Sequence, residues 1–239
     1  MPNPATITGQ VALVTGASRG IGLAIARRLG EMGARVALCA RDEGRLESAA
    51  AGLRRAGIEA SVFAADVTRA DSIASLVERT RAGLGPIDIL VNNAGIGTFG
   101  PAHELSEADW DAVLDTNLKS VFLITRAVAP QMISRRTGHI INIASLAGKN
   151  AFPGGGIYCA SKWGLLGLTY CLAEDLRGYG IRVAAVCPGS VDTEFSPHPG
   201  KDAAKMLQPE DVAHAVATLV TQAPQSFISE VLLRPTQKP

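Results

Sequence analysis

The sequence predicts an α/β fold: a doubly wound, mainly parallel sheet of about seven strands with helices on both faces. Short apolar runs alternate with longer helical segments from residue 11 to residue 233, with no linker, repeat or low-complexity tract. Hydrophobic residues make up 47% of the 239 residues, 25 are glycine and 19% are charged, which suits a buried sheet joined by tight turns. Alternating strands and helices fold most simply as one parallel sheet, so we expect a single domain over residues 1–239.

The first strand–helix–strand unit predicts a Rossmann-type dinucleotide site. Residues 11–14 form an apolar run, a helix is expected through Leu29, and a second apolar run covers residues 34–40. The turn after the first run carries Gly16, Gly20 and Gly22. Glycines allow a sharp bend and a close pyrophosphate, and a helix N-terminus offers free N–H groups to an anion. The alternative is that these glycines only shape the turn.

The alternation continues to the end of the chain. Asp42 is an expected N-cap, Ser106 with Asp109 resembles a capping box, and Pro209 is expected to open the last helix. Residues 106–135 are expected to form one long or kinked helix. The predicted helices cover residues 42–56, 69–83, 106–135, 157–178 and 209–221, and the further strands cover 58–65, 87–91, 139–144, 181–187 and 231–233.

Tyr158 and Lys162 lie four residues apart in a predicted helix, so their side chains share one face. A nearby ammonium favours a phenolate, and we expect Lys162 to lower the pKa of Tyr158 from about 10 towards neutrality. Tyr158 is then a candidate general acid/base. Taken alone, the same spacing is common on surface helices.

Polar and small residues follow the predicted strands at the edge where a parallel sheet binds its ligands. They are the glycine-rich turn, Asp66, residues 92–95, Ser145 and residues 188–189. A loop with three glycines at 154–156 joins the Ser145 strand to the Tyr158 helix, so both hydroxyls are expected to face one pocket. A phenol, a second hydroxyl and a dinucleotide together suit hydride transfer to a carbonyl.

Several motifs stand in one order along the whole chain: TGASRGIG at 15–22, NNAG at 92–95, Asn117, Ser145, YCASK at 158–162 and PG at 188–189. In this order and spacing the sequence resembles the short-chain dehydrogenase/reductase family. Residues 227–236 lack the Val-Asp-Gly-Gly ending of many members, such as the 3-oxoacyl-carrier-protein reductases. The ending looks more like that of NADP-dependent 3-hydroxy-acid and serine dehydrogenases, which puts an acyl-carrier substrate and the tetramer contact near that turn in doubt.

The resemblance implies a role for each matching residue. Tyr158 would exchange a proton with the substrate oxygen, Lys162 would bind the nicotinamide ribose, and Ser145 would hold the carbonyl. Asn117 would hold a water in a proton relay. Simpler alternatives are a helix cap for Asp66, a helix kink for Asn117 and a turn for Ser145. The implied cofactor-binding residues are Gly16, Ser18, Arg19, Gly20, Ile21, Gly22, Arg41, Asp66, Val67, Asn93, Ala94, Gly95, Tyr158, Lys162, Pro188, Gly189, Val191 and Thr193.

The residues after the second strand predict NADP(H) as the cofactor. Enzymes that prefer NAD place an acidic residue there, whereas this chain has Ala40 followed by Arg41, with Arg19 in the glycine-rich turn. Two guanidinium groups would bind a 2′-phosphate through charge-assisted hydrogen bonds. The competing interpretation is that Asp42 accepts from the ribose and Arg19 is only solvated.

Composition argues against several partners. The net charge of +1 gives no bulk attraction to nucleic acid or an anionic membrane. The four cysteines form no CxxC pair, so we expect no metal site, no disulfides and a cytoplasmic location. The first ten residues lack signal-peptide features, and no apolar run approaches the ~20 residues that span a bilayer.

Apolar residues on more than one face of two predicted helices favour a homodimer or homotetramer, unless they are buried only against the sheet. They are Val121, Phe122, Leu123, Ile124, Leu165, Leu166 and Leu168. Two segments, 97–103 and 192–207, should flank the substrate pocket, the second as a mobile lid, and His103 and His198 are expected to face solvent. The expected apolar walls are Phe99, Phe152, Phe195, Met206 and Leu207.

The functional hypothesis is an NADP-dependent oxidoreductase acting on CH–OH groups of a small molecule, with carbonyl reduction as the favoured direction. A 3-oxoacyl-thioester reductase is one alternative, and a non-catalytic dinucleotide-binding regulator that keeps the fold is another. A sugar-nucleotide epimerase is disfavoured because its GxxGxxG spacing and longer substrate domain are missing.

Overall fold

The computed structural model describes residues 6–195 and 202–239. Its seven strands form one sheet in the order β3-β2-β1-β4-β5-β6-β7, and every neighbouring pair is parallel. The predicted doubly wound sheet is therefore confirmed, and the strand order reverses between β1 and β4. The strands are β1 (Val11–Thr15), β2 (Arg35–Ala40), β3 (Ala60–Ala64), β4 (Ile87–Asn92), β5 (Gly138–Ile143), β6 (Ile181–Pro188) and β7 (Glu230–Leu233).

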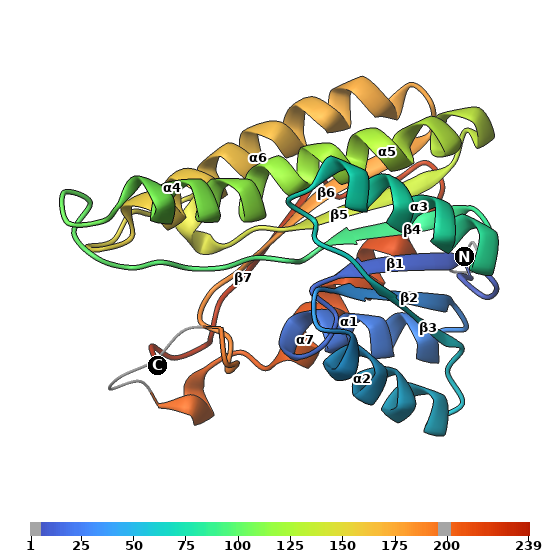
Figure 1. The fold of residues 1–239 in the computed structure, drawn as a ribbon, viewed down its shortest axis with the longest axis horizontal. Coiled ribbons are helices and arrows are strands. Elements are labelled where there is room, and N and C mark those ends of the chain that lie inside the picture. Colours follow the sequence, from blue (N-terminus) through green and yellow to red (C-terminus); the bar gives the residue numbers. More distant parts are fainter. Residues whose placement is uncertain (1–5, 196–201) are drawn as a thin grey trace.

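Helices cover both faces of the sheet. Figure 1 shows α3 to α6 on one side and α1, α2 and α7 on the other. No helix within 6–195 or 202–239 is long and apolar enough to cross a membrane. The helices are α1 (Gly20–Glu31), α2 (Glu43–Arg55), α3 (Ala70–Leu84), α4 (Glu107–Leu114), α5 (Ser120–Arg135), α6 (Gly156–Arg177) and α7 (Pro209–Val220).

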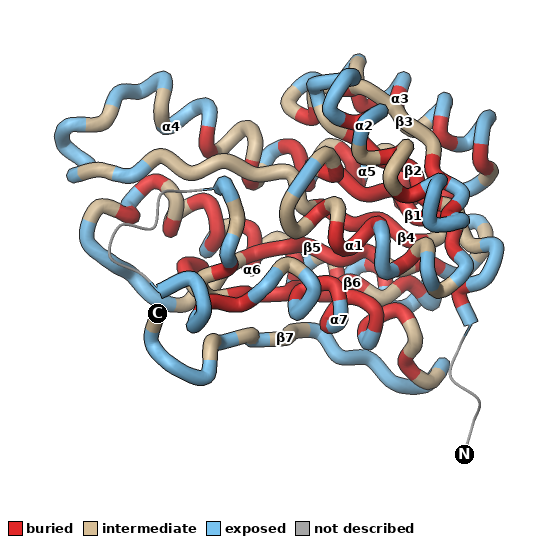
Figure 2. The backbone as a smooth tube through the Cα atoms, turned by 90° about the horizontal axis from the view of Figure 1, so that it is seen from below, coloured by how far each residue is buried: buried red, intermediate tan, exposed pale blue. Residues whose placement is uncertain are grey.

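The central strands are mostly apolar, and both of their faces are buried. Along β1, Val11 and Leu13 join the core under α3 and α5, whereas Ala12 and Val14 join the core under α1 and α7. Successive side chains of a strand point to opposite faces, which explains this division. Figure 2 shows the strands β1, β4, β5 and β6 as a buried band between the more exposed helices.

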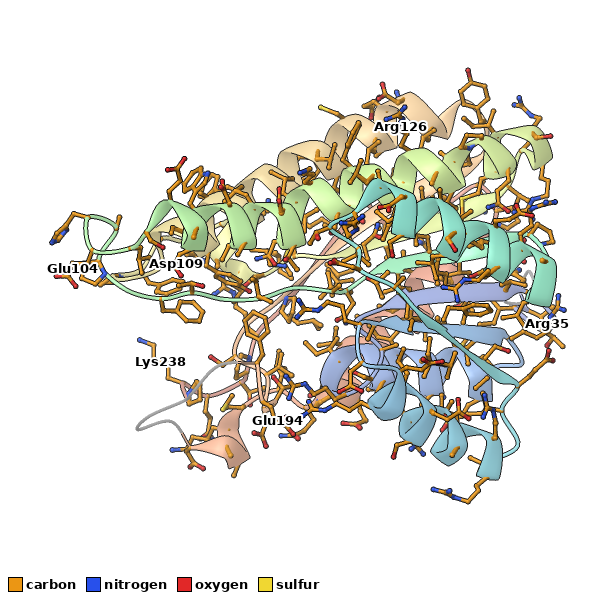
Figure 3. All side chains as sticks on the ribbon, in the orientation of Figure 1. Arg35, Glu104, Asp109, Arg126, Glu194 and Lys238 are labelled. Carbon is orange, nitrogen blue, oxygen red and sulfur yellow. The ribbon has the colours of Figure 1, made fainter. Side chains whose placement is uncertain are left out.

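Side-chain caps fix several helix starts where the sequence predicts them. Asp42 accepts from the backbone N–H of Arg45 at the start of α2. Ser106 and Asp109 form a complete capping box at the start of α4, where Asp109 is labelled in Figure 3. Asp66, by contrast, accepts from the N–H and hydroxyl of Thr68, and α3 begins only after Arg69. Asp66 therefore closes a turn and is not a helix cap.

The predicted helix over residues 106–135 is interrupted by one π-helical turn. This turn, Asp115–Lys119, joins α4 to α5 and contains Asn117. A π turn carries one extra residue in the helical ladder and is frequent at functional sites. It directs Asn117, which is 1% exposed, inward towards the end of β4.

Candidate active site

A cavity of about 1110 Å³ opens at the carboxyl ends of the strands. The residue directly after each of six strands lines it, as expected for ligand binding in a doubly wound sheet. These residues are Gly16, Arg41, Ala65, Asn93, Ala144 and Gly189, after β1 to β6 respectively. The sheet thus brings together segments that are far apart in the sequence.

The glycine-rich turn is tightly packed against the end of β4. A Cβ atom on Gly22 would lie 2.3 Å from the carbonyl oxygen of Gly16, so only glycine fits there. Gly16 has a φ of +66°, a conformation that favours glycine. The Asn93 amide donates to the carbonyl oxygens of Thr15 and Gly16 at 2.9 and 3.2 Å. The bend is therefore held in shape by protein contacts.

Thr15 adds a second link between these two segments. Its Oγ1 accepts from the backbone N–H groups of Asn93 and Ala94, both at 3.0 Å, and donates to the carbonyl of Val91. Thr15 is not among the predicted site residues, although it is the first residue of the TGASRGIG motif. Its hydroxyl fixes the start of the NNAG segment relative to β1.

Asn117 is held by three hydrogen bonds below the cavity. Its Oδ1 accepts from the N–H of Ile96 at 2.8 Å, and its Nδ2 donates to the carbonyl of Ile96 at 2.8 Å and to Ser161 Oγ at 3.1 Å. Ser161 in turn donates to the carbonyl of Tyr158 at 2.7 Å. Ser161 is fully buried and was missed by sequence reasoning, although it lies within the YCASK motif.

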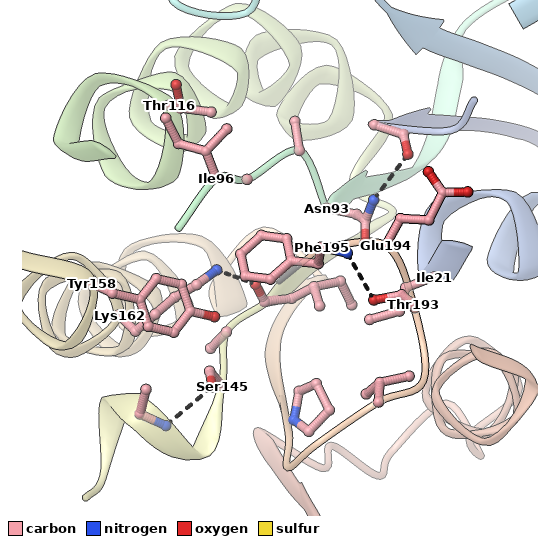
Figure 4. A pocket seen from close by; sticks show the side chains of 18 of the residues that line it. Ile21, Asn93, Ile96, Thr116, Ser145, Tyr158, Lys162, Thr193, Glu194 and Phe195 are labelled. Atoms are coloured by element: carbon pink, nitrogen blue, oxygen red, sulfur yellow. Dashed lines mark hydrogen bonds between the residues drawn. The ribbon is translucent and has the colours of Figure 1, made fainter. Parts of the chain in front are cut away.

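Ser145, Tyr158 and Lys162 converge at one end of the cavity. Figure 4 shows the Tyr158 hydroxyl pointing into the cavity, with Lys162 beside it and Ser145 close by. The Lys162 ammonium is buried and donates to the carbonyl of Ile143, at the end of β5, at 2.9 Å. Ser145 accepts from the N–H of Ala147 at 3.0 Å, and its hydroxyl is near enough to Tyr158 to lower the pKa of the phenol. The expectation that both hydroxyls face one pocket is confirmed.

The predicted direction of the Tyr158 pKa shift is wrong. Removal from water raises the pKa of Tyr158 to about 12, against a smaller lowering by the Ser145 hydrogen bond. Burial lowers the pKa of Lys162 to about 8. The ammonium is directed at Ile143 and lies 5.8 Å from the centre of the phenol ring, so desolvation dominates both groups.

The opposite end of the cavity carries the two arginines. Arg41 follows β2 and is exposed, with its positive charge beside Asp66. The hydrogen bonds from Thr68 lower the pKa of Asp66, and the charge of Arg41 adds to this. Arg19 forms an ion pair with Glu194, which lies beside the lower helix layer in Figure 3. Both guanidinium groups line the cavity, as does Asp42.

The family model for short chain dehydrogenase matches residues 10–204, which is most of the chain. The chain belongs to the short-chain dehydrogenase family. Gluconate 5-dehydrogenase of Gluconobacter oxydans is 41% identical to this short-chain dehydrogenase over 195 residues, 82% of this chain and 76% of the relative.

Two solved structures extend the comparison. A metagenomic short-chain oxidoreductase in complex with NADP is 50% identical, with a TM-score of 0.87 over 98% of this chain and 100% of that one. An actinorhodin polyketide ketoreductase variant with NADPH is 37% identical, with a TM-score of 0.89 over 98% of both chains. This short-chain dehydrogenase therefore shares its fold with dinucleotide-bound relatives over its whole described length.

Most of the predicted site residues line the cavity of this short-chain dehydrogenase. The exceptions are Gly20 and Gly22, which shape the turn, and Asn117, which lies beneath. The others all line it: Gly16, Ser18, Arg19, Ile21, Arg41, Asp66, Val67, Asn93, Ala94, Gly95, Ser145, Tyr158, Lys162, Pro188, Gly189, Val191 and Thr193.

The expected apolar walls are only partly right. Phe99, Phe152 and Phe195 line the cavity, but Met206 and Leu207 do not. Both are buried, 7% and 9% exposed, because residue 207 pairs with Val191 as an isolated parallel bridge. The His103 side chain is exposed, as expected, whereas His198 and much of the expected lid lie outside the described residues.

Proposed function

We propose that this chain is an NADP(H)-dependent oxidoreductase that interconverts a carbonyl and a secondary alcohol, with reduction favoured. One observation carries the proposal: the Ser145–Tyr158 pair and the buried Lys162 share a single cavity with Arg19 and Arg41. The residues fit NADP(H), because the bend at Gly16 and Gly22 leaves room for a pyrophosphate and the arginines suit a 2′-phosphate. When bound, NADPH supplies the hydride.

The reductive direction requires a protonated Tyr158. With its pKa at about 12, Tyr158 holds its proton at neutral pH and can donate it to the substrate oxygen. Ser145 donates a second hydrogen bond to that oxygen and stabilises the charge that develops on it. Lys162, with its pKa at about 8, is mostly protonated at pH 7 and offsets the negative charge of the resulting phenolate.

Asn117 is proposed to act behind Lys162. Its three hydrogen bonds fix the backbone at Ile96 and the hydroxyl of Ser161. A Cβ atom on Gly95 would lie 3.3 Å from Asn117 Oδ1 and 3.9 Å from Lys162 Nζ, so the two polar groups flank the same backbone position. A water held between them would return a proton to the active site from solvent.

The proposal is tested by following NADPH absorbance with a panel of small ketones, 3-oxo esters and acyl thioesters. We expect turnover of at least one ketone, and Tyr158→Phe should lower kcat by at least ~100-fold, since general acid catalysis contributes about 10²–10⁴. A Tyr179→Phe variant, on an exposed tyrosine outside the cavity, is the matched control. Full turnover by Tyr158→Phe would exclude the proposed acid.

The same panel addresses the two alternatives. An acyl-thioester reductase, the class favoured by the likeness to a polyketide ketoreductase, would prefer thioesters over simple ketones. A non-catalytic regulator would bind NADPH and turn over none of them. The burial of Lys162 beside Tyr158 supports catalysis, because a buried ammonium without a task is costly.

We also propose a homo-oligomer in the cytoplasm. Phe122 on α5 and Trp163 on α6 are 47% and 54% exposed, and large exposed aromatic side chains are typical of interfaces. The four cysteines are free thiols, which suits a reducing compartment. Light scattering of the purified protein should give a dimer or tetramer mass, and a monomer would contradict this.

A further inference from the structure

Two phenylalanine rings pack against the ring of Tyr158, and a third packs against one of them. The ring centre of Phe99 lies 5.4 Å from that of Tyr158 at an interplanar angle of 61°, and Phe195 lies 5.8 Å away at 52°. Phe152 lies 6.2 Å from Phe99. All three line the cavity, and Figure 4 shows Phe195 at the Tyr158 end of it. The rings come from three separate segments, so this cluster is a product of the fold.

Glycines fix where these rings lie. A Cβ atom on Gly97 would lie 2.7 Å from the Phe99 ring and 3.2 Å from the Phe195 ring. A Cβ atom on Gly155 would lie 2.6 Å from the Phe152 ring. The rings therefore lie directly on bare backbone. The absence of a Cβ atom at Gly97 and Gly155 therefore gives the rings room to lie at these positions.

The rings remain open to the cavity. Phe99, Phe152 and Phe195 are 42%, 43% and 42% exposed. A single exposed phenylalanine does not indicate a binding site, because folded proteins expose much apolar surface. Three rings clustered beside the catalytic tyrosine in one cavity form an apolar surface that a ligand would cover, and aromatic rings at these separations favour edge-to-face contact with a further ring.

No charged group at this end is available to a charged substrate. Among the described residues that line the cavity, Lys162 lies beside Tyr158 and donates to Ile143, whereas Glu194 lies on the Ile21 side in Figure 4 and pairs with Arg19. The remaining charged lining residues follow β2 and β3, at the other end: Arg41, Asp42, Arg45 and Asp66. A substrate carboxylate or phosphate would be desolvated here without a partner.

We propose that the substrate is an uncharged ketone that carries an aromatic ring, and that this ring lies among Phe99, Phe152 and Phe195. The inference rests on the proposed function. In the reaction the carbonyl carbon gains a hydride from NADPH, the C=O π bond breaks, and the oxygen takes the Tyr158 proton, which gives a secondary alcohol and NADP⁺. The three phenylalanine rings select which ketones bind with the carbonyl oxygen at Tyr158 and Ser145.

Matched substrates test the inference. Phenylacetone and cyclohexylacetone have nearly the same size and an unconjugated carbonyl, so they differ mainly in aromaticity. We expect kcat/KM to be about tenfold higher for phenylacetone, carried mostly by KM, because aromatic pair contacts add to simple apolar burial. A para-carboxylate on phenylacetone should lower kcat/KM by at least about tenfold, since its charge finds no partner.

Variants locate the effect. Phe99→Leu, Phe152→Leu and Phe195→Leu keep an apolar side chain, and each should reduce the ratio of kcat/KM for phenylacetone to kcat/KM for cyclohexylacetone by at least about threefold. Phe227→Leu, at an exposed phenylalanine outside the cavity, is the matched control and should leave the ratio unchanged. A melting curve for each variant checks that it is folded.

The outcomes separate this inference from the proposed function. Tyr158-dependent reduction of 2-butanone or a 3-oxo ester, with no preference for phenylacetone or with unchanged ratios in all three variants, would overturn the inference of an aromatic substrate alone. A preference for the carboxylate substrate would do the same. Failure to reduce any carbonyl would overturn both.

Discussion

Replacing Arg41 with alanine is expected to remove most of the preference for NADPH over NADH. Arg41 is exposed at the cavity edge directly after β2, where a 2′-phosphate is proposed to bind. A charge-assisted hydrogen bond is worth about 1.5–3 kcal/mol, and exposure favours the lower part of that range. The kcat/KM for NADPH should therefore fall roughly 10- to 30-fold, whereas that for NADH should change less than about twofold.

Arg19→Ala should have a smaller effect, because Arg19 already has a partner. Its ion pair with Glu194 joins side chains that are 52% and 76% exposed. A 2′-phosphate must compete with that carboxylate, and an exposed pair is worth about 0–1 kcal/mol. By the same reasoning Glu194→Gln should strengthen NADPH binding by up to about fivefold.

The measurement is kcat/KM for both nucleotides with one ketone, together with NADPH affinity from fluorescence titration. Arg27→Ala is the matched control, since Arg27 lies on α1 outside this cavity. Equal losses for NADPH and NADH in Arg41→Ala would refute the reasoning. So would a larger loss in Arg19→Ala than in Arg41→Ala.

Two further predictions concern the scaffold. Gly22→Ala should lower the free energy of unfolding by about 1–3 kcal/mol and weaken NADPH binding, because its Cβ would lie 2.3 Å from the Gly16 oxygen. An unchanged melting temperature together with an unchanged NADPH affinity would contradict this. Burial lowers the pKa of His139 from 6.5 to about 4, so the unfolded chain gains a proton at a higher pH than the folded one. Stability should therefore fall by up to about 3 kcal/mol as the pH drops from 6.5 to 4, and His139→Gln should flatten denaturant midpoints across that window.

The sequence was sufficient for the sheet because alternating apolar runs have few other ways to bury both faces. It also predicted where the strands end, and the residues at those ends line most of the cavity. The π turn at Asp115–Lys119 was not predicted, since one extra residue leaves little trace in a helix that is apolar on several faces. The kink predicted within residues 106–135 is the one expectation that corresponds to this turn.

The errors at the site have a common physical cause. The spacing of Tyr158 and Lys162 shows that they are neighbours, but not that the ammonium is directed at the Ile143 carbonyl on another element. The burial of Leu207 depends on its pairing with Val191, which no local pattern records. In both cases the outcome depends on contacts between residues that are far apart in the sequence.

The π turn also constrains how this protein can be stabilised. Deleting one residue from Asp115–Lys119 would restore an ordinary α-helix, which improves the ladder but turns every side chain before the deletion by about 100° relative to α5. Asn117 would lose its hold on the Ile96 backbone. Attempts to raise the melting temperature should therefore leave this π turn unchanged, because a regular α-helix there would lower catalytic turnover.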